Sequence, residues 1–148
     1  FDKKIANDNN LGGYFILEKD DFVYNPRISV TAPVGPINRN VNDLTGIVSP
    51  LYFVFRTHDV HPSFLSWYFK TTLWHKYMRF NGNVGAPHDR FSIKETSFLH
   101  MPIVCPSIEE QKAISSVLNE YDRLIQLNEQ KLEKLRNLKQ AMLDKMFV

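Results

Sequence analysis

From Ser107 to Val148 the chain contains neither glycine nor proline, and this feature restricts the fold more than any other. The segment opens with "PSIEEQ", in which Ser107 and Glu110 have the spacing of a capping box. The serine hydroxyl accepts the backbone N–H of Glu110, and the carboxylate accepts the N–H of Ser107. Pro106 disfavours a helix that enters from upstream. We therefore predict a helix start at Ser107, a break near Asn119 and a second, long helix to about Phe147.

Apolar side chains recur at steps of three and four along this segment, which is the spacing of one helix face. A second helix of roughly 28 residues would be about 42 Å long, whereas a domain of the preceding residues would be about 33 Å across. Leaving about eight such side chains in water would forfeit about 12 kcal/mol. We therefore expect another polypeptide to cover this face. The alternative is that the helix folds back on its own domain.

We name this face the stripe, and within it Asn128 is expected to fix the register or the number of partners. The residues predicted to form the pairing interface are Tyr121, Leu124, Ile125, Asn128, Leu132, Leu135, Leu138, Met142 and Met146.

The preceding residues predict a small β-rich unit. Short apolar runs ("GYFIL", "DDFVYN", "RISV", "GPIN") alternate with turn residues, which is typical of short strands. Residues 46–56, "GIVSPLYFVFR", are apolar on both faces and predict a central strand. Residues 61–80 predict one aromatic helix with Ser63 as its N-cap, and residues 81–90 predict a loop. The predicted fold class is α+β: a mixed or antiparallel domain over 1–106, then a helical region over 107–148.

The positive charge is concentrated in one window of the sequence. Residues 61–100 hold five Lys and Arg against two acidic residues, together with four of the five histidines, whereas the flanking parts are close to neutral. This local excess of positive charge is modest, and it indicates a polyanion such as a nucleic acid as partner. A hydrophobic content of 43% indicates a globular chain, and no apolar run is long enough to cross a membrane. The lone Cys105 cannot form an internal disulfide, and we expect a cytoplasmic protein.

Patterns that would carry catalysis are weak. His58, Asp59 and His61 form the best metal-like cluster, but zinc normally takes three or four protein ligands, so we expect surface histidines. The E-x-K pairs of nucleases occur only at 110–112 and 129–131, inside predicted helices. "YNPRI" lacks the second proline of an amino-methyltransferase motif, and no nucleotide-binding glycine loop is present. We expect no catalytic residue, no metal and no cofactor.

Several segments together resemble a known family. "VSPLYFVFR", the aromatic helix, "GAPHDRFSI" and the final "MPIVCPSIEEQKAISSVLNEYDRLIQLNEQKLEKLRNLKQAMLDKMF" are similar to the specificity subunit of type I restriction–modification enzymes, over roughly residues 13–148. The most specific positions are Pro102, Pro106, Glu110, Gln111, Ile114, Leu118, Asp122 and Ile125.

The resemblance implies one target-recognition domain followed by its conserved spacer helix. Such a subunit is non-catalytic, and each recognition domain reads one half of a split site in double-stranded DNA. Its partners are a methyltransferase subunit and a restriction (motor–nuclease) subunit. The spacer helix pairs as an antiparallel coiled coil with that of a second recognition half, in a homodimer or in a longer chain. The usual opening segment is not matched before Phe1, so we expect a truncated half or a half-length subunit.

For a domain of this kind we predict two sets of DNA-binding residues. Phosphates would be contacted by Lys70, Lys76, Arg79 and Lys94, and base edges would be read by Asn38, Arg39, Asn81, Asn83, His88 and Arg90. Arginine suits guanine and asparagine suits adenine, so Arg90→Ala is expected to impair sequence discrimination more than affinity. Two other readings remain: a coiled-coil adaptor without DNA binding, and a metal-dependent nuclease built on the histidines.

Overall fold

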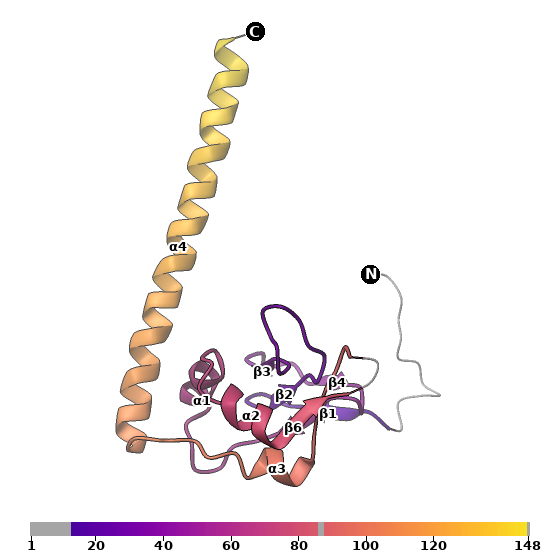
Figure 1. Cartoon of the computed structure of the whole chain (residues 1–148). Helices are drawn as coiled ribbons and strands as arrows, with labels where there is room; N and C mark the ends of the chain where they lie inside the picture. Colours follow the sequence, from indigo (N-terminus) through magenta and orange to yellow (C-terminus); the bar gives the residue numbers. More distant parts are fainter. Residues whose placement is uncertain (1–12, 86–87, 148) are drawn as a thin grey trace.

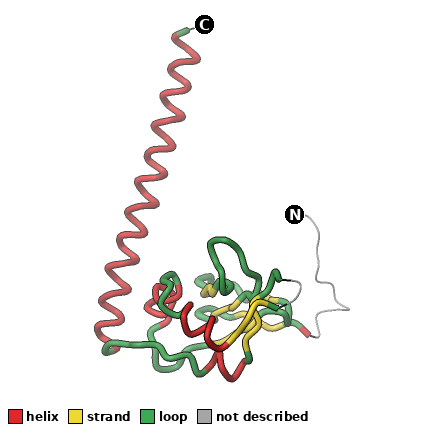
Figure 2. Tube along the Cα trace, in the orientation of Figure 1, coloured by secondary structure: helices red, strands yellow, loops and turns green. Residues whose placement is uncertain are grey.

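The computed structural model describes residues 13–85 and 88–147. Short strands and helices form a small globular part, and one helix, α4 (Ile108–Met146), extends far beyond it (Figure 1). After the last short helix the chain runs as a loop along the base of the globular part to reach the start of α4 (Figure 2). This arrangement confirms the predicted α+β class.

Within the described residues, short strands pair into three small antiparallel sheets. The sheets are β1 (Phe15–Leu17) with β4 (Gly46–Val48), then β3 (Ile37–Arg39), β2 (Phe22–Tyr24) and β5 (Phe53–Phe55) in that order, and β6 (Gly82–Val84) with β7 (Phe91–Ile93). Strands were therefore correctly predicted in "GYFIL", "DDFVYN" and "GPIN". The run "RISV" contributes no strand, only an isolated bridge at Arg27.

The prediction of one central strand over 46–56 is wrong. A turn closed by the Tyr52 N–H and the Ser49 carbonyl (3.0 Å) surrounds Pro50 and divides the segment into β4 and β5. These two strands belong to different sheets, and β5 lies at the edge of its sheet, with β2 in the centre. Its apolar residues on both faces reflect contact with helices on one side and partial exposure on the other, not a central position.

The single helix predicted over 61–80 is also interrupted. The structure has α1 (Pro62–Phe69) and α2 (His75–Asn81), and the N-cap of α1 is His61 instead of Ser63. At the break the hydroxyl of Thr71 donates to the carbonyl of Tyr68 (2.7 Å). The buried indole of Trp74 donates to the carbonyls of Phe69 (3.2 Å) and Thr71 (2.9 Å). Side chains thus satisfy the carbonyls that a continued helix would have bonded.

The predicted loop over 81–90 is shorter than expected, because β6 occupies Gly82–Val84. A short helix, α3 (Glu95–Leu99), follows β7. The core of the globular part is aromatic. The rings of Phe22 and Phe55 stack with their centroids 5.3 Å apart, and the rings of Phe55 and Phe98 meet edge to face at 5.4 Å. Such pairs add to the stabilisation from burial.

The turn before β3 requires glycine. Gly35 has φ +83°, and a Cβ there would lie 2.3 Å from the carbonyl oxygen of Asn25. The backbone at Gly35 lies close to the buried Tyr24 ring. The Tyr24 hydroxyl donates to the carbonyl of Val34 (2.9 Å). This turn therefore fixes β3 beside β2.

Helix α4 begins as predicted and ends as predicted, but it does not break. Ser107 is its N-cap, and both halves of the capping box form: Glu110 N–H to the Ser107 hydroxyl (3.4 Å) and Ser107 N–H to the Glu110 carboxylate (3.0 Å). The expected interruption near Asn119 is wrong, since the helix runs unbroken for 39 residues. At ~1.5 Å per residue its length is about 58 Å.

Candidate nucleic-acid interface

The start of α4 is fixed to the globular part by a buried glutamine. Gln111 is 2% exposed. Its Oε1 accepts the backbone N–H of His61 (2.8 Å), and its Nε2 donates to the carbonyl of Pro106 (2.9 Å). One side chain thus joins the first residue before α1 to the segment leading into α4. In the sequence Gln111 stood out only as one of the positions that carry the family resemblance, without a structural role.

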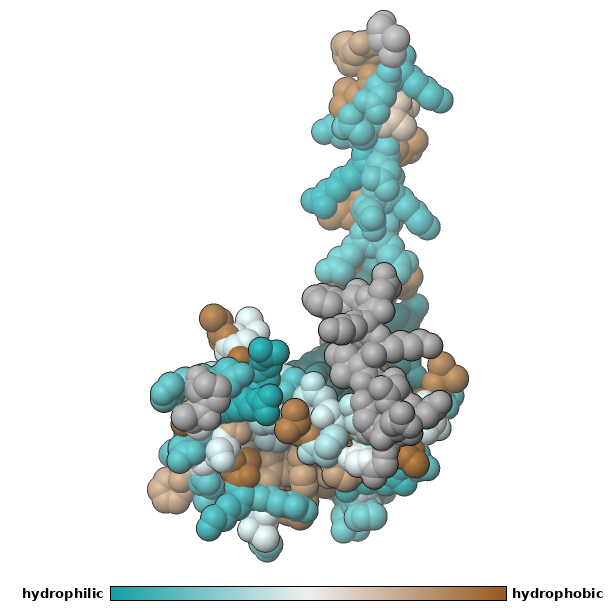
Figure 3. Space-filling view, turned by 90° about the vertical axis from the view of Figure 1, so that its right-hand side faces the viewer, coloured by the Kyte–Doolittle hydropathy of each residue, from teal (hydrophilic) through white to brown (hydrophobic). Residues whose placement is uncertain are grey.

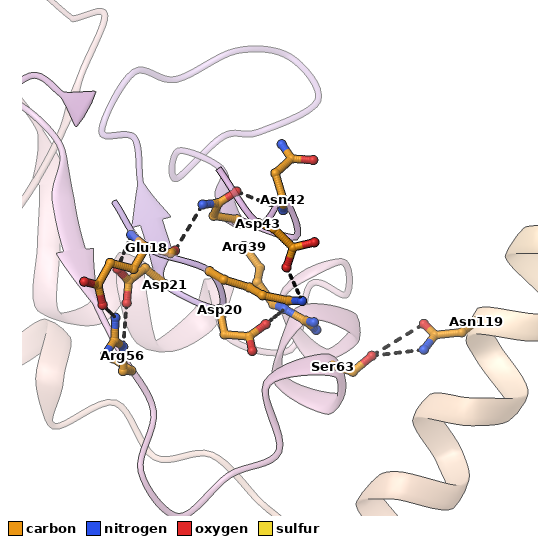
Figure 4. A network of polar contacts seen from close by, with 11 residues as sticks. Glu18, Asp20, Asp21, Arg39, Asn42, Asp43, Arg56, Ser63 and Asn119 are labelled. Atoms are coloured by element: carbon orange, nitrogen blue, oxygen red, sulfur yellow. Dashed lines mark hydrogen bonds and ion pairs between the residues drawn. The ribbon is translucent and has the colours of Figure 1, made fainter. Parts of the chain in front are cut away.

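A second contact lies two turns further along. The indole N–H of Trp67 donates to Oδ1 of Asn119 (2.8 Å). The Asn119 amide donates to the hydroxyl of Ser63 (3.1 Å), as Figure 4 shows. Lys70, at the end of α1, makes a further contact with α4. Its ammonium pairs with Asp122 (3.6 Å) and lies 3.8 Å from the centre of the Trp67 ring. The face of α4 that meets α1 is therefore largely polar.

Beyond this junction the stripe is uncovered. From Tyr121 to Phe147 every large apolar side chain is at least 40% exposed, and apolar patches recur along the helix where it leaves the globular part (Figure 3). The alternative that the helix folds back on its own domain is wrong for residues 121–147. Asn128 lies on this exposed face, where its amide donates to the carbonyl of Leu124 (2.9 Å).

Three of the predicted DNA-binding residues come together at one end of the β6–β7 pair. Asn81, Asn83 and Lys94 line a shallow cavity of ≈ 350 Å³ with Ser92. Asn83 and Lys94 are exposed, whereas the Asn81 amide donates to the carbonyl of Tyr77 (2.9 Å). This cluster combines two amides with one cation.

Lys76 and Arg79 lie on α2, on the rim of an apolar groove. The groove has a volume of ≈ 570 Å³ and includes the exposed Leu73 and Phe80. Both cations are exposed. Burial lowers the pKa of the neighbouring His75, so this histidine is neutral around pH 7 and adds no charge to the face.

The two predicted residues near "GPINRN" have different surroundings in the structure. Asn38 is exposed and shares a cleft of ≈ 270 Å³ with Lys70 and Thr72. Arg39 instead donates from Nε to Asp20 Oδ1 (2.9 Å). It belongs to a charged network at the end of β2 (Figure 4), so its charge is already paired.

That network is centred on a buried carboxylate. Asp21 accepts from Arg56 Nε (2.7 Å), and the other end of the Arg56 guanidinium donates to Glu18 (2.7 Å). Hydrogen bonds to Asp21 and then to Glu18 raise the pKa of Arg56. Arg56 is therefore a structural cation, and in this network the carboxylates outnumber the cations.

His88 and Arg90 precede β7 and are both exposed. His88 has φ +68°, a left-handed conformation that turns the chain back toward β7. Arg90 pairs with Arg27 in an antiparallel bridge. Arg27 lies outside the basic sequence window and was not among the predicted site residues. Only the pairing of distant segments identifies it.

The histidine cluster does not form a metal site in the part of the chain that the structure describes, where no group of three potential ligands is suitably placed. The backbone N–H of His61 is bonded to Gln111, as described above. Likewise, no helix among residues 13–85 and 88–147 combines the length and apolar character needed to cross a bilayer.

Comparison with known proteins identifies the family of the chain. Residues 4–137 match the family described as "Type I restriction modification DNA specificity domain". The chain therefore belongs to the type I restriction–modification specificity family, whose role is DNA sequence recognition. A stretch of 56 residues is 38% identical to the putative type I restriction enzyme MjaX specificity subunit of Methanocaldococcus jannaschii. That match covers 38% of this chain and 13% of the relative.

Proposed function

We propose that this chain is a non-catalytic recognition module that reads one half of a bipartite DNA target. On this proposal the globular part contacts the duplex, and α4 holds it at a fixed distance from a second recognition half. Methylation and cleavage belong to separate methyltransferase and restriction subunits, which the assembled module docks. No cofactor is required for recognition itself.

The observation that carries the proposal is the combination of a family match over most of the chain with an uncovered stripe on α4. A polar junction fixes the start of the helix, while the 24 residues of α4 beyond Asp122, about 36 Å long, are all exposed. Exposed leucines at the spacing of a helix-pairing seam favour a partner helix of equivalent pattern. That partner is a second copy or the second half of a longer chain.

For DNA contact we assign Lys76, Arg79 and Lys94 to phosphates, and Asn38, Asn83 and His88 to base edges, whereas the Asn81 amide is already bonded to the Tyr77 carbonyl. These side chains are carried by β3, α2 and the β6–β7 pair. Arg39 and Lys70 are better placed for structural roles, since each already pairs with a carboxylate. Direct readout needs groups whose hydrogen bonds are not consumed within the protein.

The rival function is a protein-interaction adaptor without DNA binding. A duplex-binding titration at graded salt separates the two, because phosphate contacts give a log–log slope of about −0.9 for each one. We expect a slope at least as steep as about −2.7 from the three proposed phosphate cations. Absence of binding at the lowest salt would favour the adaptor.

Mapping of methylated bases in the host, with and without this gene, tests the bipartite target. We expect one split motif to lose its methylation. An unchanged pattern in a host whose methyltransferase subunit is expressed would contradict the proposal.

A further inference from the structure

Arg27 and Arg90 come from distant parts of the chain and lie directly opposite each other. The Ile28 N–H donates to the Asp89 carbonyl (3.0 Å), and the Phe91 N–H donates to the Pro26 carbonyl (2.8 Å). These bonds flank the two arginines, which makes them a non-hydrogen-bonded pair of an antiparallel ladder. In such a pair the side chains leave the same face and lie closer together than in any other cross-strand arrangement.

Two like charges in this position destabilise the ladder unless an anion offsets them. Both arginines are exposed, and among the described residues neither makes an ion pair. They line one cavity of ≈ 200 Å³ together with Asn25, Ser49 and Tyr52. The described lining of that cavity contains no carboxylate. Glu95 lines a larger adjoining cavity of ≈ 450 Å³.

The backbone around the pair is held in place before any ligand binds. The Arg27 N–H donates to Oδ1 of Asn25 (2.9 Å), and the Arg90 carbonyl accepts the Gly85 N–H (2.9 Å). The backbone of Arg90 is therefore fixed on both sides, by Gly85 and by the bridge to Arg27. Because the main chain already places the two side chains next to each other, only their side-chain torsions need to be ordered when an anion binds.

We infer that Arg27 and Arg90 form one anion site that holds a backbone phosphate of the duplex. The inference rests on the proposed function. It gives Arg90 a different role from the base-reading one expected from its sequence position. Two adjacent guanidiniums concentrate positive charge at one point, which suits a phosphate, whereas a guanine edge is satisfied by one arginine.

The test compares R27Q/R90Q with the wild type and with K112Q/R136Q, a control that removes two exposed charges from α4. Affinity for a specific and a random duplex is measured from 50 to 200 mM salt. We expect R27Q/R90Q to weaken both duplexes by the same factor and to reduce the slope by about 0.9, so that its affinity falls about 3.5-fold less over this range. R27K/R90K should restore the slope, and the control should leave it unchanged. An unchanged slope, or a loss confined to the specific duplex, would overturn the inference.

A second measurement separates failure of this site from failure of DNA binding. Without DNA, Arg27→Gln should raise the melting temperature, because it relieves the repulsion across the ladder. Inorganic phosphate at constant ionic strength should raise the melting temperature of the wild type more than that of R27Q/R90Q. If wild-type protein binds no duplex but shows this difference, the proposed function fails and the anion site is retained. Equal responses to phosphate would remove the site whatever the duplex data show.

Discussion

Replacing Gln111 with methionine keeps the size of the side chain but removes both hydrogen bonds that join α4 to the globular part. The His61 N–H and the Pro106 carbonyl then lose partners at 2.8 and 2.9 Å in a partly buried site. An unsatisfied buried group costs about 1–3 kcal/mol, so the two together should lower the free energy of unfolding by about 2–6 kcal/mol.

Urea unfolding followed by tryptophan fluorescence measures this loss, since Trp67 lies at the same junction. The matched control is Gln130→Met, the same change at an exposed position of the same helix, which should alter the free energy of unfolding by less than about 0.5 kcal/mol. If Gln111→Met were equally mild, the buried glutamine would not be what fixes the helix, and the reasoning would be refuted.

Two further predictions concern the turn before β3 and the start of α4. Gly35→Ala should lower the free energy of unfolding by at least about 2 kcal/mol in urea titrations, because the positive φ of +83° and the nearby Asn25 carbonyl both oppose a Cβ. Gly13→Ala is the control, because a Cβ at Gly13 meets nothing within 4 Å. Equal effects of the two changes would contradict the argument. The hydrogen bonds from Ser107 lower the pKa of Glu110, so its contribution is complete above the ordinary carboxyl pKa and is lost as the pH falls through the lowered, folded-state value. The stability difference between wild type and Glu110→Ala should therefore shrink in acid, and a difference independent of pH would count against the capping box.

Local chemistry accounts for what the sequence could predict. The start of α4 depends on Ser107 and Glu110, which are three residues apart, and its stripe depends on periodicity within one helix. The strands at Phe15–Leu17 and Phe22–Tyr24 are short apolar runs between turn residues. Each of these features is determined by neighbours in the chain, and each was predicted correctly.

The features that sequence reasoning missed depend on distant contacts. The break between α1 and α2 requires the buried indole of Trp74 to bond two carbonyls, which no local propensity indicates. Asn119 looked like a helix breaker because its tertiary partner, Trp67, could not be foreseen. Gln111 belongs to a polar helix face, so a search for apolar periodicity selects the opposite face.

The candidate DNA surface shows the same division. Composition located the basic window that contains Lys76, Arg79 and Lys94, and the structure leaves all three exposed. Composition gave no reason to remove Arg39, which pairs with Asp20, from the candidate DNA-binding residues, or to include Arg27 among them. A pairing between strands of distant segments cannot be found from charge counts alone.

The central claim is that the stripe of α4 is covered by an equivalent helix. Sedimentation equilibrium of the purified chain tests it most directly, using Leu135→Glu on the stripe and Arg136→Glu beside it. We predict that the wild type and Arg136→Glu have about twice the mass of a 17.3 kDa chain, whereas Leu135→Glu has the mass of one chain and keeps its helical circular dichroism, because a charge in the seam must be desolvated. A wild-type protein that stays at the mass of one chain at every concentration, with α4 still helical, would contradict the account.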